Sequence, residues 1–254
     1  MNNPQNRHLP PFSTEELLDR VVQKVGGSLV SDLLPPNENR ESNADYVFQQ
    51  HRVIGELKRL ERDQDDNPDM AAKRNALYQK WIRERKCGVP IVYGRAVLDV
   101  RKLPSDCAME MISLYREPIA RRIRKANEQI KSARKLLKMP EASGVLFLAQ
   151  DGDYSIGPDA VLNLAARCLK GNRFSGIDDV ICFNALPARL VGDSLGYMFW
   201  IHSSRDSNRA IPQALIDSLQ EAWKAEMEAI RGPMVTPPTS IDWQDLLYRR
   251  LRRP

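Results

Sequence analysis

The chain has 254 residues, of which 42% are hydrophobic and 28% charged, a mixture typical of globular proteins that excludes global disorder. Its length is compatible with one elaborated domain or two small ones. No run of about 18 apolar residues occurs, which excludes a membrane-spanning helix, so we expect a cytoplasmic protein that does not bind membranes. The formal net charge of +5 favours polyanionic partners such as nucleic acid.

The N-terminal part of the chain is predicted to form one helix and three strands. Apolar residues recur at helical spacing after Ser13 or Thr14, either of which can cap the helix, until Gly26 and Gly27 end it. Three β-prone segments follow, of which the last two are joined by a tight turn and form a hairpin: 28–34, 45–49 and 52–57.

The middle of the chain is predicted to be mainly helical. A helix is expected over 70–86 and a short strand or extended pair over 91–100, and a further helical region opens at Pro104. The strongest periodicity is a narrow apolar seam on one long helix, with Pro118 at its start: Ile119, Ile123, Ala126, Ile130, Ala133 and Leu137. This seam suits either packing within the chain or a homodimer.

The C-terminal part alternates between strands and helices. The nearly continuous apolar run at 144–149 is typical of a strand covered on both faces. Further strands are expected at 180–183 and 197–201, and further helices at 158–170, 212–230 and 241–251. The alternation predicts an α/β fold with a central mixed sheet and crossover helices.

Three charged residues of the predicted hairpin carry the candidate chemistry. Side chains alternate between the faces of a strand, so Glu56 and Lys58 share one face, and the hairpin returns Asp45 beside them. Two carboxylates provide the oxygen ligands that Mg²⁺ prefers, and a nearby lysine can orient a water molecule or stabilise a phosphate. The same residues are equally compatible with a solvated surface strand next to a turn.

The order of these elements and the D…E-x-K residues resemble the PD-(D/E)xK, or restriction-endonuclease-like, nuclease superfamily. The resemblance covers about residues 14–183, and Ala44 stands where the motif has proline. It implies a helix–strand–strand–strand–helix–strand core, metal binding by Asp45 and Glu56, and assistance to the nucleophilic water by Lys58. Members often add an acid from the first helix, for which Glu16 is a candidate, although a capping role suits Glu16 better.

The long helix is also the most basic part of the chain. Between Arg116 and Lys138 it has nine basic and two acidic residues. Such a helix can follow a phosphate backbone, or can simply present a solvated face. The residues expected to bind nucleic acid are Arg121, Arg122 and Lys125.

We therefore expect a metal-dependent nuclease that hydrolyses phosphodiesters of DNA in preference to RNA, with Mg²⁺ as cofactor and Mn²⁺ as a substitute. The alternative is a catalytically silent protein of the same fold that binds nucleic acid or docks to a partner. The expected organisation is a flexible segment over 1–12, an α/β domain over 13–203 with a helical insertion at 61–141, and a C-terminal helical extension over 204–254.

Overall fold

The computed structural model describes residues 13–34, 43–61, 67–88, 103–151, 157–171, 173–185, 196–205 and 208–235. Three expected segments lie outside these residues: the flexible N-terminus over 1–12, the strand over 91–100 and the helix over 241–251. None of the helices in the described part of the chain is both long and apolar enough to cross a bilayer.

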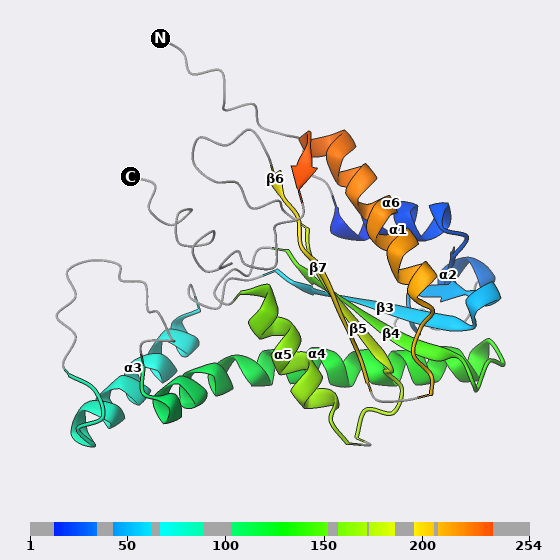
Figure 1. Cartoon of the computed structure of the whole chain (residues 1–254). Helices are drawn as coiled ribbons and strands as arrows, with labels where there is room; N and C mark the ends of the chain where they lie inside the picture. Colours follow the sequence, from blue (N-terminus) through cyan, green and yellow to red (C-terminus); the bar gives the residue numbers. More distant parts are fainter. Residues whose placement is uncertain are drawn as a thin grey trace, which may run out of the picture.

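A six-stranded mixed sheet forms the centre of the protein, with strand order β1-β2-β3-β4-β5-β7 (Figure 1). Its strands are β1 (Ser28–Leu29), β2 (Tyr46–Phe48), β3 (Val53–Leu60), β4 (Ser143–Gln150), β5 (Asp179–Asn184) and β7 (Trp200–Ser204). Strands β1, β2 and β3 pair antiparallel, β3, β4 and β5 pair parallel, and β7 pairs antiparallel with β5. A second, two-stranded sheet pairs β6 (Gly196–Tyr197) with β8 (Met234–Val235). The predicted α/β fold with a mixed sheet is therefore confirmed.

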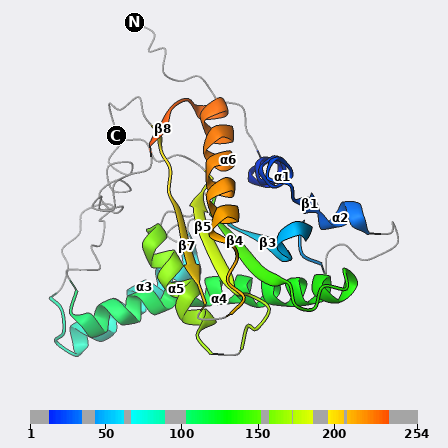
Figure 2. The same cartoon turned by 45° about the vertical axis from the view of Figure 1, so that its right-hand side comes forward.

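Helices cover both faces of the large sheet. One face packs on α1 (Thr14–Lys24) and α6 (Gln213–Arg231), and the other on α4 (Ser105–Leu136) and α5 (Pro158–Leu169) (Figure 2). Each face buries its own apolar cluster, as expected when a sheet lies between two helical layers. The predicted seam of the long helix is buried against the sheet, so the seam packs within the chain.

The long helix α4 extends past the sheet, where α3 (Pro68–Arg83) lies beside its N-terminal part (Figure 1). A small cluster of Trp81, Cys107 and Met111 joins the two helices. Pro118 was predicted at the start of the long helix, and this was wrong, because the helix begins 13 residues earlier, at Ser105, and Pro118 lies inside it. A proline inside a helix weakens it, and here the packing of α4 against α3 and the sheet stabilises the helix.

The N-terminal helix confirms the prediction, and the first strand corrects it. The side chain of Ser13 accepts a hydrogen bond from the Glu16 N–H and caps α1. The strand expected over 28–34 is wrong beyond Leu29, where α2 (Val30–Leu33) begins. The partner strand β2 has only three residues; the Val30 N–H still donates to the carbonyl of Asp45, the next position of the same register, and the chain then turns into α2.

Candidate functional site

The predicted hairpin forms and places the first acid opposite the second. A short 3-10 helix, η2 (Gln49–His51), joins β2 to β3. In the antiparallel register Tyr46 faces Gly55. One residue before Tyr46 therefore lies opposite one residue after Gly55, which places Asp45 opposite Glu56. Lys58 follows two residues later on β3 and shares a face of the sheet with Glu56.

This shared face is the one covered by α4. Val47, two residues after Asp45, and Ile54, two residues before Glu56, both lie in the apolar cluster beneath α4. Period-two alternation then directs Asp45, Glu56 and Lys58 into the same layer. The three charged groups are thus carried into a layer that is otherwise apolar.

The three side chains contact one another and the strand. Asp45 Oδ2 accepts a hydrogen bond of 2.8 Å from the Leu57 N–H, which fixes its carboxylate on β3. Lys58 Nζ forms an ion pair with Glu56 Oε1. The Glu56 side chain is only 1% exposed and that of Lys58 14% exposed, so the pair is shielded from water. The structure therefore brings together the three residues that the sequence singled out, and their chemical roles stay predictions.

Burial makes the charged form of Glu56 costly. Desolvation, followed by the negative charge of Asp45, raises the pKa of Glu56 to about 8, against the lowering effect of Lys58. Desolvation also raises the pKa of Asp45, although the Leu57 N–H and Lys58 oppose the shift. Glu56 Oε2 is buried and, while both carboxyl groups are ionised, has no hydrogen-bond partner within the described part of the chain, whereas a proton on Glu56 can be shared with Asp45. Two neighbouring carboxyl groups in this state favour a proton or a cation between them.

The long helix supplies a fourth polar group that the sequence prediction missed. Gln129 Oε1 accepts a hydrogen bond of 2.8 Å from Lys58 Nζ, and Gln129 is 8% exposed. The available signal was its spacing, because Gln129 lies three residues after Ala126 and four before Ala133, both in the apolar seam. A glutamine at such a position faces the core and needs a polar partner there.

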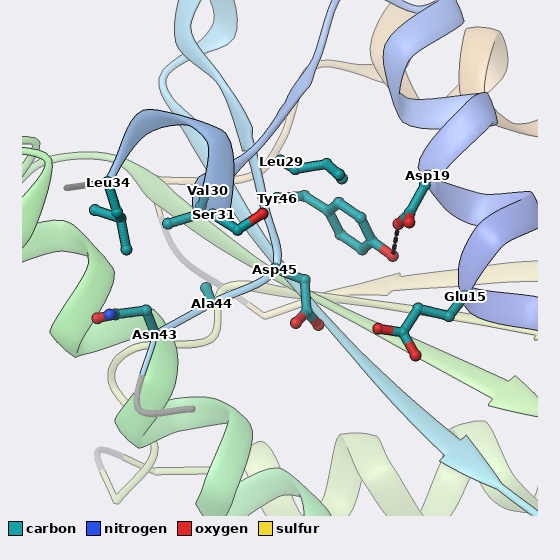
Figure 3. A pocket seen from close by; sticks show the side chains of 10 residues that line it. All are labelled: Glu15, Asp19, Leu29, Val30, Ser31, Leu34, Asn43, Ala44, Asp45 and Tyr46. Atoms are coloured by element: carbon teal, nitrogen blue, oxygen red, sulfur yellow. Dashed lines mark hydrogen bonds between the residues drawn. The ribbon is translucent and has the colours of Figure 1, made fainter. Parts of the chain in front are cut away.

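A pocket of about 200 Å³ opens at the edge of this site, between α1, α2 and the segment before β2. Figure 3 shows the Glu15 side chain extending across it toward the carboxylate of Asp45. Asp19, one turn further along α1, accepts a hydrogen bond of 3.0 Å from the Tyr46 hydroxyl. Glu16, the acid considered from the sequence, does not line the pocket, whereas Glu15 does. The side of α1 that faces the site was not readable from the sequence.

The three cations predicted to bind nucleic acid separate into two kinds. Arg121 and Lys125 are exposed on α4. Arg122 is half-buried, and its guanidinium donates to the Arg59 carbonyl at 2.9 Å and to the Pro118 carbonyl at 3.2 Å. Arg122 therefore fastens α4 to the end of β3.

Comparison with protein-family models, with curated proteins and with solved structures finds no match. The chemistry of the site thus rests on its own residues. Within the described ranges, no group of three His, Cys, Asp or Glu side chains is placed to hold a metal ion. Asp45 and Glu56 nevertheless fit Mg²⁺, which is usually bound through one or two carboxylates and keeps several water molecules. The unpaired Glu56 Oε2 is an oxygen of the kind that such an ion takes.

Proposed function

We propose that the chain is a Mg²⁺-dependent nuclease with a restriction-endonuclease-like core, which hydrolyses phosphodiesters of DNA in preference to RNA. The observation that carries the proposal is the buried Glu56 carboxylate, which has one oxygen without a hydrogen-bond partner in the described chain, beside Asp45 and Lys58. Burying such a group lowers stability, so a protein that keeps one is expected to use it for another purpose. Perturbed ionisable groups of this kind gather at functional sites.

Each of the three residues has a role in this proposal. Asp45 and Glu56 would hold Mg²⁺, or Mn²⁺ in its place, and Lys58 would orient the attacking water or stabilise charge on the phosphate. When bound, the ion supplies Lewis acidity and a more acidic water. Glu15 replaces Glu16 as the candidate acid from the first helix, because it faces Asp45 across the pocket. Apart from the short helices α2 and η2 and the additional helix α3, the succession α1, β1, β2, β3, α4, β4 is compatible with the core of this superfamily.

A direct test measures cleavage of single-stranded and duplex DNA and of RNA with Mg²⁺, with Mn²⁺ and with EDTA. We expect cleavage of DNA that requires a divalent ion, and slower cleavage of RNA. Calorimetry should show Mn²⁺ binding that Asp45→Asn weakens. Nucleic-acid binding with no cleavage under any metal condition would instead favour the silent, binding-only alternative.

The nucleic acid is expected to lie along the exposed cations of α4. Arg121 and Lys125 are one helical turn apart, and Lys125 is one turn before Gln129, which touches Lys58, so the row leads toward the site. Arg121→Ala with Lys125→Ala should weaken DNA binding and reduce the slope of log K against log salt by roughly 0.9 for each cation. Fluorescence anisotropy between low and moderate salt measures this slope.

The matched control is Lys224→Ala on α6, which covers the opposite face of the sheet. It should leave the slope unchanged. A double variant on α4 with the slope of the wild type would show that this row does not contact phosphates.

A further inference from the structure

One helix contacts both halves of the proposed site. Gln129 on α4 accepts from Lys58 Nζ through Oε1 and donates through Nε2 to the carbonyl of Asn43, at 3.2 Å. One turn further along α4, the Ser132 hydroxyl donates to the Asn43 side-chain oxygen at 2.9 Å. Asn43 is buried, at 6% exposure, and precedes Asp45 by two residues.

We propose that Gln129 and Ser132 are positioning residues, which align Asp45 with Glu56 and Lys58 by fixing Asn43 and the Lys58 ammonium to the same two turns of α4. The inference deepens the proposed function and rests on it. Both residues act through Asn43 and Lys58, to which they bond, and neither is assigned a role on the phosphate or the ion.

The segment before β2 needs such support. β2 has three residues and β1 two, so few ladder hydrogen bonds reach the chain at Asp45. Lys58 has a flexible four-carbon stem, and Gln129 adds a second acceptor to Glu56 at its tip, which restricts the rotamers of the stem. Misplacing a reacting group by about 1 Å can cost about a hundredfold in rate. A helix that holds both groups supplies rigid support.

The other buried amide of α4 has a different use. Asn127 Oδ1 accepts a hydrogen bond of 2.8 Å from the Gly176 N–H, away from the three charged residues. Its contact joins α4 to the turn before β5, where Gly176 packs closely against the helix. Gln129 and Ser132, in contrast, bond to Lys58 on β3 and to Asn43 in the segment before β2, which carry the proposed site.

The Leu57 amide reports on this alignment without any assay of activity. Its N–H donates to Asp45 Oδ2, so its hydrogen exchange rises when Asp45 leaves its place. In the metal-free protein we expect Gln129→Met and Ser132→Ala to raise exchange at Leu57 by about tenfold, the effect of losing roughly 1.4 kcal/mol of local protection. Exchange on β4, at Leu146 and Leu148, should stay as in the wild type.

Two controls accompany these variants. Ser132→Thr keeps the hydroxyl and should retain the protection of Leu57. Glu128→Gln changes an exposed neighbour on α4 and should leave both exchange and cleavage unchanged. If Gln129→Met fails to fold, Ser132→Ala and Ser132→Thr still give the comparison.

Cleavage kinetics then separate the two proposals. In a wild type that cleaves DNA, Gln129→Met should lower kcat by about a hundredfold while KM changes little. Unchanged Leu57 exchange in both Gln129→Met and Ser132→Ala overturns the positioning inference, whatever the rate of cleavage. A wild type that cleaves nothing, with Leu57 exchange that responds as expected, overturns the nuclease and leaves the alignment by α4 supported.

Discussion

Replacing Glu56 by Gln, or Lys58 by Met, is expected to lower the cleavage rate by about a thousandfold or more, because the first would remove a ligand of the proposed ion and the second the ammonium proposed to act on the water or the phosphate. Glu56→Gln keeps the shape of the side chain but removes the charge that would hold the ion. Lys58→Met keeps the length of the stem and removes the ammonium. The measurement is single-turnover cleavage of labelled DNA at saturating Mg²⁺.

Both variants have matched controls elsewhere in the protein. Glu128→Gln changes an exposed carboxylate on α4, and Lys73→Met an exposed ammonium on α3. These should cleave within about twofold of the wild type, since surface substitutions away from a site have small effects. Circular dichroism should show all four proteins folded. Wild-type cleavage by both Glu56→Gln and Lys58→Met would refute the assignment of the site.

The sequence was sufficient where local patterns coincide with the final packing. The two strands of the hairpin, the buried strand at β4 and the apolar seam of α4 all depend on residue alternation or helical spacing, which the structure preserves. The convergence of Asp45 with Glu56 followed from the hairpin alone, because antiparallel register is a local property.

Other features depend on contacts between distant segments, which local patterns do not encode. The strand expected over 28–34 ends at Leu29, where the chain turns into α2 and leaves the short strand β2. The choice of Glu15 over Glu16 depends on how α1 is rotated over the sheet. Arg122 could be distinguished from Arg121 only once the end of β3 was in place beside α4.

The protein should become less stable as the pH rises from about 5.5 to 8.5, and Glu56 is the reason. Its pKa is raised from 4.5 to about 8 in the folded protein, so the folded state holds this proton more tightly than the unfolded chain. Stability from this group is complete below the unfolded pKa and is lost as the pH rises toward the folded pKa. At 1.36 kcal/mol for each pH unit, the loss is on the order of 3 to 4 kcal/mol over this interval. The raised pKa of Asp45 acts in the same direction.

Glu56→Gln should remove most of this dependence, since a neutral amide of the same size has no proton to lose. At pH 8.5 we expect the free energy of unfolding of Glu56→Gln to exceed that of the wild type by about 2 kcal/mol, although this variant should have lost most of its cleavage. A gain in stability with a loss of activity is the pattern expected for a residue that serves function at a cost in stability. Urea denaturation of the metal-free proteins at pH 5.5, 7.0 and 8.5 measures the free energies of unfolding, with Glu128→Gln expected to follow the wild type.

Mg²⁺ should stabilise the wild type at pH 8.5, because a ligand that binds only the folded state adds to its stability. It should have little effect on Glu56→Gln, which lacks the carboxylate proposed to bind the ion. If the stability of Glu56→Gln depends on pH as strongly as that of the wild type, another group titrates over this interval. The charge of Glu56 would then be compensated within the protein without an ion.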